Sequence, residues 1–197
     1  VSVNGNVVSA IAVADALRAS SVDAVARMRT RGLRVVMLTG DSEAAAEAIA
    51  HDAGIDEVLH SVSPSGKASA IEKLQLQGAV VAMVGDGIND APGLAQADVG
   101  IAMGSGTDVA KSTADVTLLR SDLHTVLEAI DVSRATMRTI RQNLFLAFVY
   151  NVLGIPLAAG LLIPLTGMAL SPMIAAGAMA LSSVTVVSNA LRLRISR

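Results

Sequence analysis

The sequence contains no cysteine among its 197 residues, which excludes a disulfide framework, a thiolate metal site and a cysteine nucleophile. Aromatic residues make up only 2% of the chain and no basic stripe is interleaved with them, so we expect no nucleic-acid partner. Charged residues account for 16%, which is low for a soluble domain, and none occurs between Arg141 and Arg192. The opening is strand-like and lacks a signal peptide, so we expect a segment of a longer protein.

The first 122 residues alternate short apolar runs with helical patterns. Apolar residues on both sides of Asn4-Gly5 predict a β-hairpin over residues 1–8, with its second strand continuing to residue 14. Further strands are predicted at 33–38, 57–59, 80–84, 99–103 and 116–119, with helices between most of them. This alternation favours a Rossmann-like α/β fold, in which helices cover both faces of one parallel sheet.

The sequence is organised around the stretch that ends the strand at 80–84, Val84-Gly85-Asp86-Gly87-Ile88-Asn89-Asp90. Its two glycines allow the backbone to turn sharply without a Cβ penalty. If a helix begins near Asn89, Asp86 and Asp90 converge at the carboxyl end of the strand, where open α/β sheets bind ligands. Two carboxylates at this position suit Mg²⁺. The alternative interpretation is an Asx-rich turn that only caps a helix.

Two further polar groups follow predicted strands. Thr39-Gly40-Asp41 comes after the strand at 33–38, and Lys67 comes after the Ser63-Pro64-Ser65-Gly66 turn. A hydroxyl, backbone N–H donors, an ammonium group and two Mg²⁺-binding carboxylates together form a cradle for phosphoryl transfer, which requires positioning and charge neutralisation. Taken singly, Thr39 fits an ordinary turn and Lys67 fits a solvated lysine at a helix start.

From Leu123 onward the pattern becomes one long helix with Arg134, Arg138 and Arg141 at helical spacing. It leads into residues 144–165, about 22 residues without a charge, which is long enough to cross a bilayer.

A second uncharged stretch, 170–191, follows a tight link, and Arg192, Arg194 and Arg197 come after it. Arginines outside both ends of the pair predict a transmembrane hairpin with both ends in the cytoplasm. The alternative is a buried helical hairpin of a soluble protein. The predicted division is an α/β domain at 1–122, a connecting helix at 123–143, membrane helices at 144–165 and 170–191, and a tail at 192–197.

Met37–Asp41, Val84–Pro92 and Ala97–Ala102 resemble the phosphorylation domain of the P-type ATPases, which are members of the haloacid dehalogenase superfamily. The resemblance implies that Thr39 contacts a phosphoryl group and that Lys67 neutralises it. It also implies that Asp86 binds Mg²⁺ with support from Asp90. The same resemblance assigns Gly40, Asp41 and Asn89 to the catalytic site and Gly85 and Gly87 to the cofactor-binding loop.

The resemblance is partial. The family's nucleophilic aspartate lies in Asp-Lys-Thr-Gly-Thr, and no aspartate in this chain is followed by lysine. The nucleotide-binding domain, which holds most of the ATP site, and the actuator domain with its Thr-Gly-Glu are not found here either. The chain therefore resembles the last quarter of such a pump and, alone, is expected to be inactive.

The transported ion is predicted from polar residues in the two uncharged stretches. Tyr150 and Asn151 lie in the first, and Met179 and Ser183 lie four residues apart in the second. Polar groups at membrane depth mark transport sites, and a thioether is a soft ligand that suits Cu(I). Packing and hydrogen bonding between helices are the alternative roles. The combination resembles the Cu(I)-transporting subgroup of heavy-metal P-type ATPases and lacks the lysine and Asp-x-Gly of the zinc subgroup.

The resemblance implies part of a Cu(I)-exporting ATPase that works through an aspartyl-phosphate and uses Mg²⁺ and ATP. We expect a multi-pass protein of a bacterial plasma membrane with its soluble domain in the cytoplasm. Its expected partners are the lipid bilayer, the rest of the pump and a copper chaperone that docks on the missing N-terminal part. The alternatives are a membrane-tethered phosphatase of the haloacid dehalogenase type and a catalytically dead, membrane-anchored binding domain.

Overall fold

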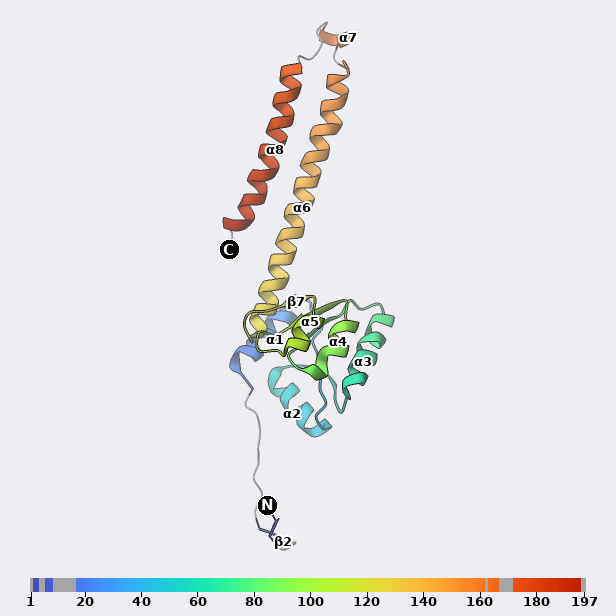
Figure 1. Cartoon of the computed structure of the whole chain (residues 1–197), viewed down its shortest axis with the longest axis vertical. Coiled ribbons are helices and arrows are strands. Elements are labelled where there is room, and N and C mark those ends of the chain that lie inside the picture. Colours follow the sequence, from blue (N-terminus) through green and yellow to red (C-terminus); the bar gives the residue numbers. More distant parts are fainter. Residues whose placement is uncertain (1, 4–5, 9–16, 162, 167–171, 196–197) are drawn as a thin grey trace. The chain divides into compact units, whose positions relative to one another are not determined.

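The computed structural model describes residues 2–3, 6–8, 17–161, 163–166 and 172–195 (Figure 1). They form two compact units, Val1–Glu128 and Ala129–Arg197. The first unit begins with an antiparallel pair in which β1 (Ser2–Val3) lies against β2 (Asn6–Val7). This pair confirms the predicted hairpin, while its expected continuation to residue 14 lies outside the described residues.

The remaining strands of the first unit are parallel, as predicted, but they form two separate sheets. β3 (Val36–Leu38) pairs with β4 (Glu57–Leu59), and β5 (Ala82–Gly85), β6 (Val99–Ala102) and β7 (Val116–Thr117) pair in that order. The single continuous sheet expected from the β-α alternation is therefore not formed by the described residues. The parallel pairing and the helices around it confirm the predicted α/β class.

Several strands are shorter than the apolar runs that predicted them. β3 begins at Val36 instead of residue 33, and β7 ends at Thr117 instead of residue 119. A strand needs a hydrogen-bonded neighbour along its length, and Leu119, which is 97% exposed, has moved out of the sheet. Apolar character alone thus overestimated the extent of pairing.

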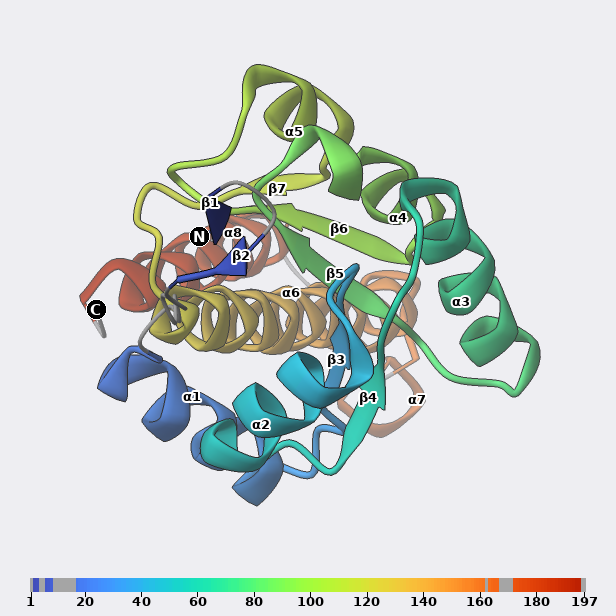
Figure 2. The same ribbon diagram turned by 90° about the horizontal axis from the view of Figure 1, so that it is seen from below.

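Six short helices surround these strands: α1 (Ala19–Thr30), α2 (Glu43–Ala53), α3 (Pro64–Leu76), η1 (Ile88–Asp90), α4 (Ala91–Gln96) and α5 (Asp108–Thr113). Helices α1 and α2 lie beside the β3–β4 pair, and α4 packs on β5 and β6 (Figure 2). Helix α3 begins where the Ser63 hydroxyl accepts a hydrogen bond from the Gly66 amide at 3.1 Å, with Pro64 in the first turn. Helix α2 ends at Gly54, whose φ of +72° is typical of a C-terminal cap.

The core next to the three-stranded sheet is small. Leu94 of α4 is only 1% exposed and packs with Ala102 of β6 and Ala110 of α5. Gly100 lets β6 approach α4 closely, because a Cβ at this position would lie 2.5 Å from the Leu94 carbonyl oxygen. This core fixes α4, and with it the loop that joins β5 to α4.

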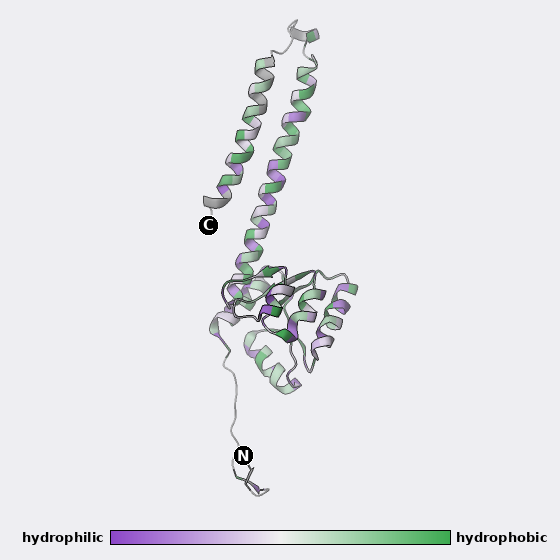
Figure 3. Ribbon diagram, viewed as in Figure 1, coloured by the Kyte–Doolittle hydropathy of each residue, from purple (hydrophilic) through white to green (hydrophobic). Residues whose placement is uncertain are grey.

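The second unit is helical. Helix α6 (Leu123–Ala158) is continuous over 36 residues, so the connecting helix and the first predicted membrane helix are one element. Along its C-terminal half, hydrophobic residues predominate (Figure 3). By length and composition, α6 is a candidate membrane span among the described residues. The short helix α7 (Ile163–Thr166) and the helix α8 (Pro172–Ile195) follow.

Helix α6 ends at Ala158, although the uncharged stretch that predicted it runs to residue 165. Pro156 lacks the N–H that continues a helix, and Gly160 takes a φ of +94°. The Leu161 amide donates to the Pro156 carbonyl at 3.0 Å, and the Gly160 amide donates to the Leu157 carbonyl at 3.2 Å. These two bonds form a Schellman motif, which satisfies the last carbonyls of the helix.

Side-chain amide groups form hydrogen bonds between helices α6 and α8. The side-chain nitrogen of Asn189 donates to Asn143 Oδ1 at 2.8 Å and approaches Gln142 Oε1 at 3.3 Å. Hydrogen bonds of this kind hold apolar helices together where the hydrophobic effect contributes little.

The core around Leu94 gives a direct test of the fold. We expect Leu94→Ala to lower the free energy of unfolding by about 2–5 kcal/mol, because the residue is fully buried and its neighbours are small. Leu76→Ala is the matched control, since Leu76 is 81% exposed, and should change stability by less than about 0.5 kcal/mol. Urea unfolding of the detergent-solubilised chain measures both, and equal effects of the two substitutions would contradict this description of the core.

Candidate functional site

An ion pair between Lys67 and Asp90 lies at the carboxyl end of β5. Lys67 Nζ is 2.5 Å from Asp90 Oδ1, and the two side chains are 13% and 14% exposed. The other oxygen, Oδ2, accepts hydrogen bonds from the amides of Asp86 and Gly87 at 3.2 and 3.1 Å. Asp90 therefore ties α3 to the loop after β5.

The pKa of Asp90 reflects two opposing effects. Burial raises it, but hydrogen bonds from Lys67 and the Gly87 and Asp86 amides, together with the charge of Lys67, outweigh burial and hold it below its ordinary value of 3.8. Asp90 is thus an ionised partner of Lys67 at neutral pH.

The glycines in this loop are required by the close approach of Asp90. A Cβ on Gly85 would lie 2.7 Å from Asp90 Cβ and 2.9 Å from its carboxylate. A Cβ on Gly93 of α4 would lie 3.2 Å from Ile71 Cδ1 and 3.5 Å from Lys67 Cβ, so α3 and α4 pack closely beside the ion pair. The glycines were predicted as turn residues. Gly85 has a second role, because it leaves room for the side chain of Asp90.

Asp86 is the carboxylate that remains available. Its side chain is exposed and, like that of Asn89, has no hydrogen-bond or ion-pair partner among the described residues. The described chain contains no group of three or more His, Asp or Glu residues that could hold a metal by themselves. One free carboxylate fits Mg²⁺ nonetheless, because this ion keeps several waters and shares a substrate phosphate.

A second loop supports Asp86 from the other side. The Thr107 amide donates to the Asp86 carbonyl at 2.9 Å, and a Cβ on Gly106 would lie 3.2 Å from that oxygen. Arg18 lines the same hollow as Asp86 and donates from Nη1 to the Ser121 carbonyl at 2.9 Å. The positioning role of Gly106 and Thr107 was not expected from the sequence, where three elements of secondary structure, η1, α4 and β6, separate them from Asp86.

The Thr39-Gly40-Asp41 turn follows β3. The Thr39 hydroxyl donates to Asp41 Oδ2 at 2.8 Å and accepts from the Asp41 amide at 3.2 Å. The loop between β4 and α3 binds this turn, since the Ser61 amide donates to the Asp41 carbonyl at 2.8 Å and the Val62 amide to the Thr39 carbonyl at 3.0 Å. Ser61 takes a φ of +54° in this loop. The same loop continues into α3 and Lys67.

The structure thus gathers Lys67, Asp86 and Asp90 at the end of β5 and holds Thr39 and Asp41 at the end of β3. No hydrogen bond or ion pair within the described part of the chain joins these two groups directly. Between their strands lies an apolar cavity of about 150 Å³, lined by residues of β3, β5 and α3 that include Val36, Leu38, Ala82, Met83, Ile71 and Leu74.

The residues predicted to bind the transported ion lie on the two long helices. Tyr150 and Asn151 are on α6, and Met179 and Ser183 are on α8. Asn151 Nδ2 donates to the Ala147 carbonyl of its own helix at 3.0 Å. The side chain of Met179 lies outside the described residues, so the convergence of these four groups stays a prediction.

Measuring the free energy of unfolding at acid pH tests the contribution of the Lys67–Asp90 pair. Because folding lowers the pKa of Asp90, its carboxylate stabilises the fold above about pH 4, and this contribution is lost as the pH falls through the folded-state pKa. We expect Asp90→Asn to be less stable than the unsubstituted chain near neutral pH by roughly 1–3 kcal/mol. The two unfolding free energies should converge in acid, whereas a constant difference would show that the charge of Asp90 is not responsible. Asp52→Asn, at a carboxyl that is 73% exposed, is the control in the same urea titrations.

The chain is similar to several known proteins. Residues 1–98 match a family model described as a haloacid dehalogenase-like hydrolase. The probable copper-transporting ATPase PacS of Synechococcus elongatus is 58% identical over 194 residues, which are 98% of this chain and 26% of that protein. The silver exporting P-type ATPase of Salmonella typhimurium is 55% identical over 197 residues, which are 100% of this chain and 24% of that protein.

A solved structure shows the same likeness in three dimensions. The crystal structure of a zinc-transporting PIB-type ATPase in its E2.Pi state matches with a TM-score of 0.78 at 42% identity, over 91% of this chain and 28% of that chain. The chain therefore spans about a quarter of the length of the curated relatives that it matches. In sequence and in fold, the chain belongs to the heavy-metal P-type ATPases, whose haloacid dehalogenase-like domain it carries in part.

Proposed function

We propose that this chain is the part of a Cu(I)-exporting ATPase that holds Mg²⁺ and a phosphoryl group and supplies two metal-binding membrane helices. The observation that carries the proposal is the Lys67–Asp90 pair beside Asp86, whose carboxylate has no partner among the described residues. A relative named as a probable copper-transporting ATPase, at 58% identity, and one named as a silver exporting P-type ATPase, at 55%, support the class of pump.

Each residue of the site has a chemical role in this proposal. The Lys67 ammonium donates one hydrogen bond to Asp90, and its other N–H groups can donate to a phosphoryl oxygen. The Gly40 amide has no hydrogen-bond partner in the described structure, so it can donate to the same group, while Thr39 contributes its hydroxyl. Asp86 would hold Mg²⁺, which when bound neutralises charge on the phosphoryl oxygens. Asp90 acts through Lys67 and the loop amides and is a positioning residue.

The rest of the pump is proposed to complete the sheet. Strands of parallel sheets are normally buried on both faces, yet every residue of β3 and β4 is only half-buried. The apolar side chains that line the cavity between β3 and β5 are available to pack against a further strand from a segment outside this chain. Such a strand would end between Thr39 and Asp86, where the nucleophilic aspartate of the family's Asp-Lys-Thr-Gly-Thr is needed. A copper chaperone that docks on the remainder stays a prediction.

The membrane part of the proposal assigns both α6 and α8 as spans of a bacterial plasma membrane. The bonds from Asn189 to Asn143 and Gln142 place the two helices in contact near the start of the uncharged stretch of α6. Tyr150 and Asn151 on α6, with Met179 and Ser183 on α8, are proposed to coordinate Cu(I) as the transported substrate. The thioether favours Cu(I) or Ag(I) over Zn²⁺.

Phosphorylation tests the first half of the proposal. In a full-length pump that contains this segment, we expect Asp86→Asn to reduce the acid-stable phosphoenzyme formed from ATP at least about tenfold, because Mg²⁺ loses a charged ligand. Asp108→Asn, at an exposed helix start, is the control and should leave the phosphoenzyme level unchanged. The present chain alone should form no phosphoenzyme. A phosphoenzyme on this chain would show that a nucleophile within it has been overlooked.

Metal titration tests the second half. Met179→Leu keeps the side-chain volume, so it should cost less than about 1.5 kcal/mol in packing while it removes a thioether ligand. We expect the full-length variant to bind fewer Cu(I) ions per protein in anaerobic titration and to lose Cu(I) transport. Met173→Leu on the same helix, at a side chain that is 85% exposed, should preserve both. Unchanged binding and transport in Met179→Leu would assign Met179 to packing.

A further inference from the structure

Three arginines on α6 form an exposed basic face that the proposed function does not use. Arg134, Arg138 and Arg141 line an open hollow together with Ser133, Met137 and Gln142. All three side chains are exposed, and none of the three guanidinium groups has a hydrogen-bond or ion-pair partner among the described residues. We call these three residues the arginine face.

The arginine face points away from α8. At about 100° per residue, Arg138 and Arg141 lie within about 40° of Arg134 around the helix. Asn143, which bonds to Asn189 of α8, lies about 180° from Arg134. Helix α8 therefore occupies the opposite side of α6 and leaves the guanidinium groups open.

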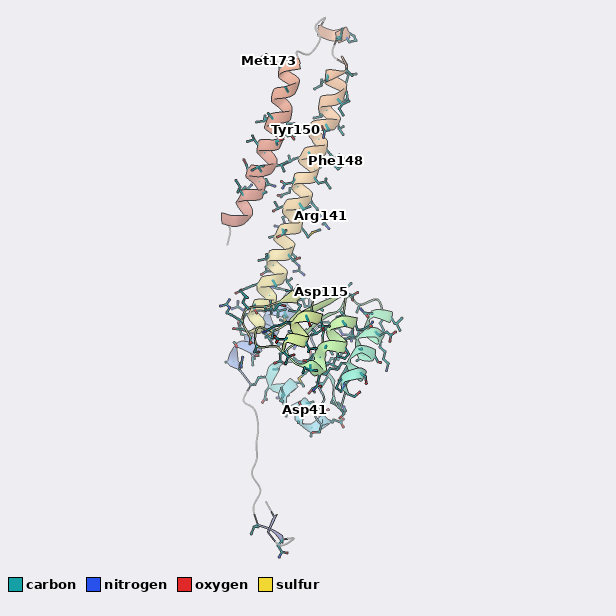
Figure 4. The ribbon with its side chains drawn as sticks, in the orientation of Figure 1. Asp41, Asp115, Arg141, Phe148, Tyr150 and Met173 are labelled. Carbon is teal, nitrogen blue, oxygen red and sulfur yellow. The ribbon has the colours of Figure 1, made fainter. Side chains whose placement is uncertain are left out.

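The same side of α6 becomes apolar immediately after the arginines. Phe145, Phe148 and Val152 lie within about 40° of Arg134 around the helix. They are 67%, 60% and 65% exposed, and the first two are the only phenylalanines in the chain. Arg141 and Phe148 extend from α6 on the side away from α8 (Figure 4). The order of cationic, aromatic and aliphatic side chains along one exposed stripe matches the order of chemistry from a membrane surface to its interior.

The axial spacing agrees with this order. At about 1.5 Å per residue, Arg141, Arg138 and Arg134 lie about 4.5, 9 and 15 Å before Leu144, where the uncharged stretch begins. A headgroup region is about 5–8 Å thick, and arginine side chains extend several ångströms along a helix to reach it. Arg141 thus lies at headgroup depth, Arg138 lies at its outer edge, and Arg134 lies about 7–10 Å beyond that edge.

We propose that the arginine face binds the phosphate groups of anionic phospholipids in the leaflet next to the first unit of the chain. The inference rests on the proposed assignment of α6 as a membrane span. Guanidinium groups pair with phosphate oxygens through two parallel hydrogen bonds, and three of them on one side of a helix match two or more headgroups. Because α6 is continuous from Leu123 to Ala158, this contact fixes the depth in the bilayer of the helix that follows the strands of the first unit.

The absence of cysteine makes a site-specific test practical. Ser133→Cys, in the hollow, gives the complete chain a single labelling position for a fluorescent donor. The chain is reconstituted in phosphatidylcholine vesicles that contain a fixed fraction of phosphatidylglycerol, with the acceptor dye on either lipid. We expect energy transfer to report roughly fivefold enrichment of phosphatidylglycerol near the label, which is the effect of about one basic residue at an anionic surface.

Two charge variants and one matched control define the site. Replacing Arg134, Arg138 and Arg141 with Gln should abolish the enrichment, and replacing them with Lys should retain part of it, because charge remains but the paired hydrogen bonds are lost. The control replaces Arg192, Arg194 and Arg197 with Gln, which removes the same charge from the end of α8, and should preserve the enrichment. An equal loss in the control would overturn the proposal in favour of a general effect of charge.

Two further measurements distinguish failure of the lipid site from failure of the membrane assignment. Extraction of the vesicles at high pH shows whether the chain is inserted, and a chain that is washed off contradicts the membrane assignment itself. Insertion without enrichment overturns only the lipid site and points to a carboxylate-bearing protein segment on this face. Excess inorganic phosphate should leave the enrichment unchanged, whereas its loss would identify a site for free phosphate instead of a headgroup.

Discussion

The ion pair between Lys67 and Asp90 is the interaction on which the candidate site depends. It joins the start of α3 to the loop after β5, and its aspartate also accepts two backbone amides from that loop. A buried charge pair of this kind is weak as a source of stability but strong as a constraint, because either partner alone would be left uncompensated. The constraint holds the Lys67 ammonium on Asp90 and leaves Asp86 exposed, without a side-chain partner among the described residues.

Helix α6 carries two kinds of chemistry on opposite sides. Asn143, which bonds to α8, and Tyr150 lie on one side, while the arginine face and the exposed phenylalanines lie on the other. A helix that is polar and paired on one side and cationic then apolar on the other is well suited to contact a second helix and a lipid surface at once. Both sides belong to one helix of 36 residues.

Part of the fold was predicted from local patterns, while the roles assigned to the site residues stay predictions. The Asn4-Gly5 hairpin follows from turn chemistry, and the parallel pairing follows from the alternation of strands and helices. Two features could not be predicted in this way. The strands separate into two sheets because no described strand lies between β3 and β5, and Gly106 supports Asp86 because a loop distant in sequence folds back onto it.

The sequence by itself determined which residue types stand at the strand ends, the class of cation that they suit, and the two long uncharged stretches. These properties are local, since a glycine turn, a carboxylate or an apolar run keeps its chemistry in any fold. Only the tertiary structure decided how the two aspartates divide their roles: the packing of α3 on α4 assigns Asp90 to Lys67 and leaves Asp86 open. It likewise decided where α6 ends and which side its arginines occupy, because caps and helix contacts depend on atoms brought together from separate parts of the chain.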